Sequence, residues 1–187
     1  MKIKTVGTIC NAARCICCFE EKETQWIGDG IAEYALHGIP ILKDPELLRI
    51  LDVTERDAEK FNIQHNSKVT DHFDLSDSVT DEDILTESDI VLSINGEQIL
   101  PLKGTAGVLF IKAKYLKPYQ GSNVRLFERT DRCGFPYIAV KEGLFMSGLI
   151  LPYQINDENK KEMRDILTAC RFHYEFEQHP NQEDKDI

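Results

Sequence analysis

The sequence predicts an α+β fold, with a largely antiparallel sheet and helices on one side. Residues 123–155 contain three successive segments of β-branched and aromatic residues, separated by turn-forming residues. Two other stretches, 44–61 and 156–170, carry helix start signals followed by apolar residues at helical spacing. Meandering strands covered by separate helices are typical of α+β domains.

Strand formers also dominate the first 36 residues. KIKTV begins at Lys2 and ARCICCFEE at Ala13, and TQWIG pairs with IAEYAL across the turn at Asp29-Gly30. Asp-Gly readily takes the positive φ angles of a two-residue hairpin. We therefore expect a second meander here.

Two helices are predicted next. Asp44 is expected to cap the first, with Pro45 at the first helical position and Glu46 near the positive end of the helix dipole. Thr54 is expected to cap a second helix that ends near Phe61.

The middle of the chain changes character. Residues 62–88 are polar and acidic and have no sustained periodicity, so we expect an irregular connector. Residues 89–102 predict a hairpin, because Asn95-Gly96 lies between two apolar runs and suits a type I′ turn.

Two more helices are expected beyond the hairpin. Residues 112–117 are mostly good helix formers, and Pro118 should end that helix. Asn156 or Asp157 should cap the last helix, whose apolar face comprises Met163, Ile166, Leu167 and Cys170.

A chain of 187 residues can bury a substantial core without disulfides or metal. We predict one domain over residues 1–176, made of two halves, 1–68 and 89–170, with the acidic connector between them. The acidic tail at 177–187 is expected to be disordered.

Composition predicts a cytoplasmic protein without a membrane partner. Hydrophobic residues make up 42% and charged residues 29% of the chain, and no apolar run approaches the ~18 residues of a membrane span. The N-terminus lacks an apolar stretch long enough for a secretory signal. The six cysteines are therefore expected to be reduced thiols.

Charge is unevenly distributed in this chain of net charge −10. Residues 69–102 contain nine acids and neither Lys nor Arg, whereas residues 103–141 contain eight bases and two acids, a local charge of +6. Such a basic segment is consistent with a nucleic-acid contact and also with an ordinary solvated surface.

The N-terminal cysteines suggest a metal site, since thiolates bind zinc. However, Cys10, Cys15, Cys17 and Cys18 do not form the paired C-x2-C units of a structural zinc site. Strand alternation would place Cys15 and Cys17 on one face and Cys18 on the other. We expect small buried hydrophobes, no metal ligands and no cofactor.

No catalytic motif stands out, and we predict no catalytic residues and no enzyme activity. Cys133, at a predicted turn beside Arg132, could form a nucleophile with a histidine. The sequence does not say which of five histidines would be its partner: His37, His65, His72, His173 or His179.

The central segment resembles a known module. Residues 110–116 (FIKAKYL) resemble a strand that leads into a Tyr-Leu helix, residues 123–127 (NVRLF) a valine-containing strand, and residues 149–155 (LILPYQI) a closing strand. In this order they are similar to the terminal module of bacterial DNA sliding clamps, the processivity factors of replicative polymerases.

The resemblance implies a ring of β-α-β-β-β modules whose helices surround duplex DNA. A meander followed by a capped helix is expected twice, at 14–52 and 123–170, which gives two clamp-like β-α-β-β-β halves. The implied function is a non-enzymatic, DNA-associated binding module that forms a homo-oligomer, of the kind a phage or other small replicon could encode. The chain departs from the family in its shorter length and in Gln154, where arginine is common.

The resemblance also implies two sets of site residues. A basic helix and its surroundings would contact the DNA backbone through Lys103, Lys112, Lys114 and Lys117. The closing strand would bind a short peptide of a replication protein through Leu149, Leu151, Pro152 and Tyr153. Pro152 removes a ladder donor and therefore favours a sheet edge.

Two other functional classes stay open. The cysteines could belong to a small cytoplasmic metal-binding protein or cysteine-dependent enzyme. The chain could also be a virion or host-interaction protein without a nucleic-acid role.

Overall fold

The computed structural model describes residues 1–65, 69–80, 82–105 and 107–178. The chain forms two compact units, Met1–Tyr153 and Gln154–Ile187. Within the described residues, no helix is both long enough and apolar enough to span a membrane.

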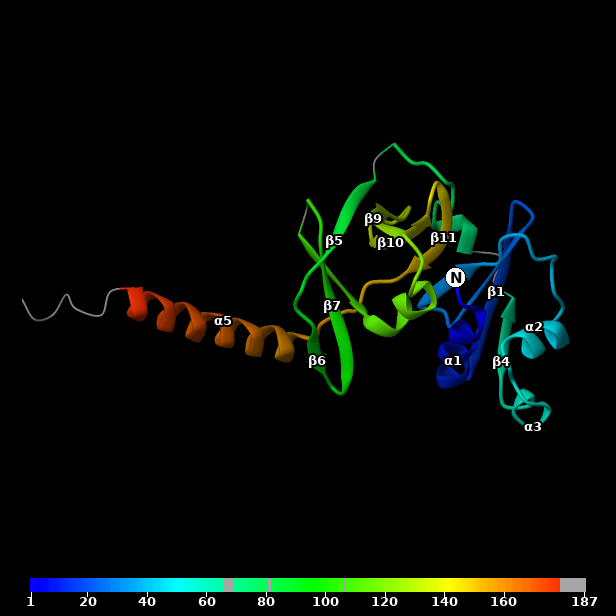
Figure 1. Ribbon diagram of the computed structural model, residues 1–187, viewed down its shortest axis with the longest axis horizontal. Helices are drawn as coiled ribbons and strands as arrows, with labels where there is room; N and C mark the ends of the chain where they lie inside the picture. Colours follow the sequence, from blue (N-terminus) through cyan, green and yellow to red (C-terminus); the bar gives the residue numbers. More distant parts are fainter. Residues whose placement is uncertain (66–68, 81, 106, 179–187) are drawn as a thin grey trace, which may run out of the picture. The chain divides into compact units, whose positions relative to one another are not determined.

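The first unit combines short helices with eleven described strands (Figure 1). The N-terminal elements are α1 (Ile3–Ala13), β1 (Cys15–Glu21), β2 (Thr24–Gly28), β3 (Ala32–Ala35), α2 (Asp44–Ile50), α3 (Glu55–Ala58) and β4 (Asn62–His65). The remaining elements are α4 (Val69–His72), β5 (Asp83–Glu87), β6 (Leu92–Ile94), β7 (Glu97–Lys103), β8 (Val108–Lys112), the 3-10 helix η1 (Ala113–Tyr119), β9 (Val124–Thr130), β10 (Pro136–Glu142) and β11 (Phe145–Ile150).

The sheet is mostly antiparallel, which confirms the predicted α+β class. Its strand order is β4-β1-β2-β3-β11-β10-β9-β5-β7-β6, and β8 also pairs with β7. The pairing of β1 with β4 is parallel. At the centre, β3 pairs with β11, so the meanders β1-β2-β3 and β9-β10-β11 lie in mirror order about that pair.

A helix precedes each meander. α1 precedes β1, and η1 precedes β9. The two helices contact each other, and the backbone N–H of Lys2 donates to the carbonyl of Pro118 at 2.7 Å. The predicted β-α-β-β-β order therefore occurs from β8 to β11, but the N-terminal part begins with a helix.

The predicted strand at KIKTV is wrong, because Lys2 is the N-cap of α1 and the other four residues belong to that helix. Val6, Ile9 and Cys10 are buried and recur at the i, i+3, i+4 spacing of an amphipathic helix. This apolar face packs on β1 and β2. Tertiary burial of one helix face outweighs the strand preference of a few β-branched residues.

The core has two parts, one on each face of the central sheet. Ile16, Cys18 and Ile27 belong to the cluster that includes the apolar faces of α1 and η1. Phe19 and Trp26 belong to the second cluster, where their rings stack with centroids 5.8 Å apart. The sulfurs of Cys15 and Cys17 are 3.8 Å apart, so these two residues share a face, and the predicted alternation along β1 is confirmed.

The described part of the segment 62–88 contains more regular structure than the sequence predicts. It contains β4, α4 and β5, and Leu75 packs into the second core cluster. β5 pairs with both β9 and β7. Sequence periodicity is weak here because most residues of β4 and β5 are exposed, so neither strand alternates between polar and apolar residues.

Three local predictions are settled by the structure. The type I′ hairpin is confirmed, with φ of 51° at Asn95 and 77° at Gly96. Asn156 caps α5 (Asp157–Gln178) by accepting the N–H of Asn159 at 2.8 Å. Helix η1 continues through Pro118 to Tyr119, so Pro118 does not end it. It is a 3-10 helix, which is wound more tightly than an α-helix. Of the predicted tail, 177–178 lie in α5, and 179–187 lie outside the described residues.

Buried charges attach the connector to the sheet. Arg129 is 2% exposed and donates to Glu82 at 2.6 and 2.9 Å, and its other terminal nitrogen donates to the carbonyls of Asp74 and Ser76. Lys141 also donates to Glu82. Burial of Glu82 opposes ionisation, but hydrogen bonds from Lys141 and Arg129 outweigh it and lower the pKa of this carboxyl.

We predict that Glu82→Gln destabilises the protein by about 3–5 kcal/mol, because it leaves two buried cations without their counterion. Urea denaturation at pH 7 measures this loss. Glu87→Gln, on the exposed part of β5, is the control and should change stability little. The stabilisation by Glu82 is present above the ordinary glutamate pKa of 4.5 and is lost as the pH falls through its lower folded value. A loss below about 1 kcal/mol at pH 7 would contradict the importance of this triad.

Candidate functional site

The four lysines predicted to contact DNA do not share one surface. Lys112, at the end of β8, lies 3.1 Å from Glu97 and 5.7 Å from the ring centroid of Tyr153. The β7–β8 register pairs Lys112 with Ile99 and Lys103 with Val108. Lys103 therefore lies at the opposite end of the ladder from η1, because its partner Val108 begins β8 whereas η1 follows the last residue of that strand, Lys112.

Helix η1 carries the other two lysines. Lys117 is exposed, and the Nζ of Lys114 lies 5.0 Å from the ring centroid of Tyr115. The contact between α1 and η1 adds the exposed Lys2, whose backbone is bonded to Pro118. Sequence reasoning missed Lys2 because it placed this residue in a strand.

The predicted peptide-binding residues differ in burial. Leu149 is 2% exposed and belongs to the second core cluster, so it packs inside the sheet. Leu151, Pro152 and Tyr153 are half-buried, and the N–H of Tyr153 donates to the carbonyl of Phe110 at 2.6 Å. β11 lies between β3 and β10, so Pro152 follows a central strand and not the expected edge.

Most N-terminal thiols are buried as small apolar groups. Cys10 donates to the carbonyl of Gly28 at 3.3 Å, and the sulfurs of Cys15 and Cys17 are 3.8 Å apart. Burial, reinforced by the carboxylate of Glu33, raises the pKa of Cys17 to about 12. Among the described residues, no three His, Cys, Asp or Glu side chains converge on a metal position.

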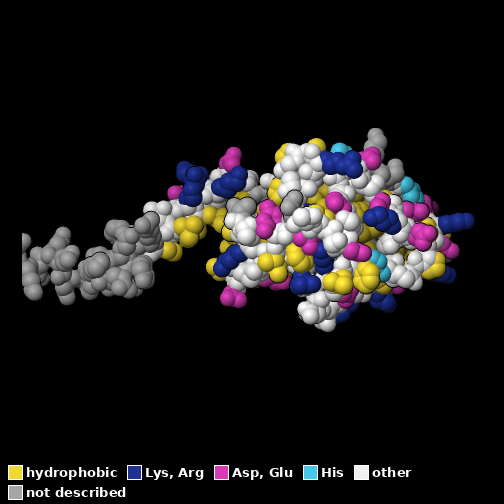
Figure 2. Space-filling model, turned by 90° about the horizontal axis from the view of Figure 1, so that it is seen from above, with side chains coloured by type: hydrophobic (Ala, Val, Ile, Leu, Met, Phe, Trp, Pro, Cys, Tyr) yellow, Lys and Arg dark blue, Asp and Glu magenta, His cyan; other side chains and the backbone are white. Residues whose placement is uncertain are grey.

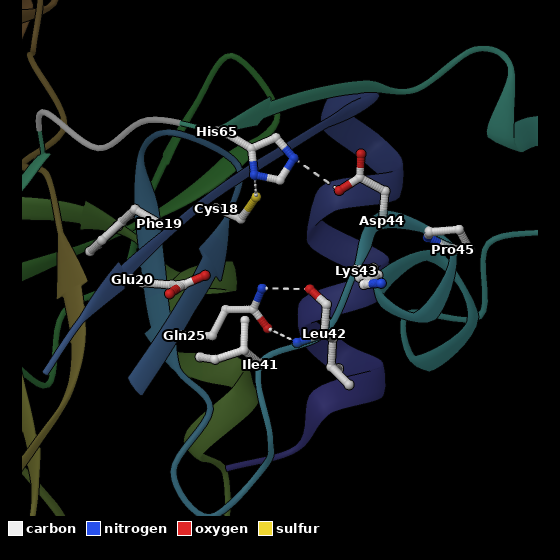
Figure 3. Close-up of a pocket in the computed structure, with 10 residues that line it drawn as sticks. All are labelled: Cys18, Phe19, Glu20, Gln25, Ile41, Leu42, Lys43, Asp44, Pro45 and His65. Atoms are coloured by element: carbon white, nitrogen blue, oxygen red, sulfur yellow. Dashed lines mark hydrogen bonds and ion pairs between the residues drawn. The ribbon is translucent and has the colours of Figure 1, made fainter. Parts of the chain in front are cut away.

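Cys18 is also buried, but its thiol faces a histidine across a strand pair. Its Sγ lies 3.3 Å from Nδ1 of His65, and Nε2 of His65 lies 2.9 Å from Oδ1 of Asp44 (Figure 3). The parallel register of β1 and β4 places Cys18 directly opposite His65. Burial and the carboxylates of Asp44, Glu33 and Glu20 raise the pKa of Cys18 to about 11.

Asp44 is available for this contact because it does not cap α2. Lys43 occupies the cap position, and its backbone N–H donates to Glu46 at 2.8 Å. The side chain of Asp44 therefore points toward His65, as Figure 3 shows. The sequence alone did not predict that His65 lies beside Cys18 or that Asp44 lies beside His65, because no local signal reveals that β4 pairs with β1.

A pocket of about 760 Å³ adjoins the side chains of Cys18, His65 and Asp44. Apolar and charged groups share its wall, and Figure 3 shows all of them: Cys18, Phe19, Glu20, Gln25, Ile41, Leu42, Lys43, Asp44, Pro45 and His65. The cysteine considered from sequence, Cys133, is exposed at the β9–β10 turn, where its N–H donates to Asp131.

Comparison of the chain with protein-family models, curated proteins and solved structures finds no match.

We predict that Leu149→Ala destabilises the protein by about 2–5 kcal/mol, since it opens a cavity in the second core cluster. Tyr153→Ala should cost less, because its ring is partly exposed. Thermal and urea denaturation of both variants would measure the difference. If Tyr153→Ala is the more damaging change, its ring serves the core and is not free to bind a peptide.

Proposed function

We propose that this protein is a cytoplasmic, non-enzymatic binding module that associates with duplex DNA during replication in a phage or other small replicon. The observation that supports this most directly is the β-α-β-β-β order from β8 to β11, which is the element order of a sliding-clamp module. The mirror-ordered meanders and the contact between α1 and η1 add a second likeness, because clamps present helices on one side of a sheet.

The DNA contact is assigned to the paired helices. Lys114 and Lys117 are three residues apart on η1, and α1 brings Lys2 beside them. Lys112 is engaged by Glu97 and contributes less. These side chains would meet phosphates and read no base sequence.

The predicted contact is weak. The chain carries a net charge of −10, and over the first unit Figure 2 shows basic and acidic side chains interspersed. Only a few phosphates would be neutralised, so affinity would depend on enclosing the duplex rather than on charge alone. A homo-oligomeric ring supplies that enclosure, and Leu151, Pro152 and Tyr153 remain the proposed contact for a peptide of a replication protein.

Replacement of Lys2, Lys114 and Lys117 by glutamine should abolish DNA association at low salt and leave the melting temperature nearly unchanged. In the unmodified protein, log affinity should fall with log salt by about 0.9 per phosphate neutralised, hence by no more than about 3 for each subunit that contacts the duplex. Fluorescence anisotropy with a short duplex measures both.

The matched control replaces three exposed lysines elsewhere, Lys22, Lys43 and Lys60, and removes the same charge. Equal loss of affinity in the two variants would show that net charge, and not the helix pair, governs binding. Absence of DNA affinity in the unmodified protein would instead favour a virion or host-interaction role.

The native particle should contain several copies of the chain, because one 21.4 kDa subunit is too small to encircle a duplex. Native mass spectrometry with and without duplex DNA tests this. A strict monomer under both conditions would rule out a ring and leave only a one-sided DNA contact.

A further inference from the structure

The tautomer of His65 is determined by its two neighbours. The Asp44 carboxylate can only accept a hydrogen bond when ionised, so Nε2 of His65 carries the proton that is donated to it at 2.9 Å. In the neutral imidazole Nδ1 is then the unprotonated nitrogen, and it accepts the S–H of Cys18 at 3.3 Å. A thiol, an imidazole and a carboxylate in this order are the groups of a base-activated nucleophile.

The backbone holds this arrangement. Cys18 and His65 are register partners in the β1–β4 pair, and Asp44 lies in the first turn of α2. Cys18 is 1% exposed, whereas the His65 side chain is 64% exposed. The thiol is thus almost fully covered, and only a small reactant could reach it.

The pocket limits which reactants suit the thiol. Its volume of about 760 Å³ lies within the range of small-molecule sites, and Phe19, Ile41 and Pro45 give it an apolar wall. The amide of Gln25 is occupied at both ends, since it donates to the Leu42 carbonyl at 2.9 Å and accepts the Leu42 N–H at 3.0 Å. At most one N–H of Gln25 is left to stabilise an oxyanion, which disfavours amide substrates and favours activated acyl donors.

We propose that Cys18, His65 and Asp44 form a nucleophilic thiol site that accepts an acyl group from a small, activated ester or thioester bound in this pocket. The site lies on β1, β4 and the start of α2 and includes none of the lysines assigned to DNA. It is therefore independent of the proposed DNA role.

The step is acyl transfer to sulfur. Cys18 Sγ forms a bond to the acyl carbon while its proton passes to Nδ1 of His65, and Asp44 stabilises the imidazolium cation. The bond from the acyl carbon to the leaving oxygen or sulfur then breaks. The leaving group takes the proton from His65, which restores the neutral imidazole.

The pH dependence of this step distinguishes it from simple thiolate attack. Because burial and the nearby carboxylates raise the pKa of Cys18 to about 11, little free thiolate exists at neutral pH. If His65 takes the proton during attack, the acylation rate should stop rising once the imidazole is neutral, and imidazoles commonly change charge between about pH 5 and 8. Thiolate attack alone would make the rate rise toward pH 11.

The test uses the full chain with exposed Cys133 and Cys170 replaced by serine, and p-nitrophenyl acetate as the acyl donor. Acetylation of each remaining cysteine is followed by peptide mass mapping at several pH values. Cys17 is the internal control, because it lies on the same strand, is buried and faces Gln64 instead of a histidine. We expect acetyl-Cys18 to form faster than acetyl-Cys17 and to show the early plateau.

His65→Gln should slow acetylation of Cys18 by about 100-fold or more at pH 7.5 and leave Cys17 unchanged, because it removes the base. Asp44→Asn should cause a smaller fall, since it weakens only the orientation of His65. Equal rates at Cys17 and Cys18, an unchanged rate at Cys18 in His65→Gln, or a rate that rises to pH 11 in the unmodified site would each overturn the proposal. Faster labelling of both cysteines in His65→Gln, a sign of local opening, would do the same.

Discussion

The pairing of β3 with β11 is the contact on which the first unit depends. It joins strands more than 100 residues apart, with Gly148 opposite Tyr34 and Leu149 opposite Glu33. Tyr34 donates to the carbonyl of Tyr115, and Tyr119 donates to the carbonyl of Ser147, so η1 is attached to both strands. A side chain at Gly148 would meet the Tyr119 hydroxyl at 2.1 Å, which explains why a glycine lies there. Without this pair, α1 and η1 would have no common surface to cover.

The parallel pairing of β1 with β4 has the corresponding importance for the pocket. β4 is a short strand at one end of the sheet, and three of its four residues are exposed. Its packing contributes little burial, yet its register decides that His65 lies opposite Cys18. The same thiol on an isolated hairpin would be one more buried cysteine, like Cys10 or Cys17. The contacts of Cys18 with His65 and of His65 with Asp44 therefore depend on two strands and the start of one helix. The proximity of Lys2 to η1 depends on two helices.

Some charged side chains from different segments also come together only in the folded chain. The acidic segment and the basic segment, adjacent in sequence, meet in space through Glu82, Arg129 and Lys141. Part of the local positive charge is thus neutralised inside the fold, and Lys112 is paired with Glu97 at a partly exposed position. The basic side chains left for an outside partner are fewer than the sequence suggests, and they come from two separate segments.

The sequence by itself determined the features that depend on neighbouring residues. Asn95-Gly96 specifies its own turn, Asn156 caps the helix that follows it, and the alternation of Cys17 and Cys18 follows from the two-residue period of a strand. Only the tertiary structure decided the rest. Strand pairing over long separations leaves no local pattern, so β4, the His65 partner of Cys18 and the separation of Lys103 from η1 could not be predicted. The helix at Ile3–Ala13 forms because its apolar face is buried on the sheet, and that burial exists only in the folded chain.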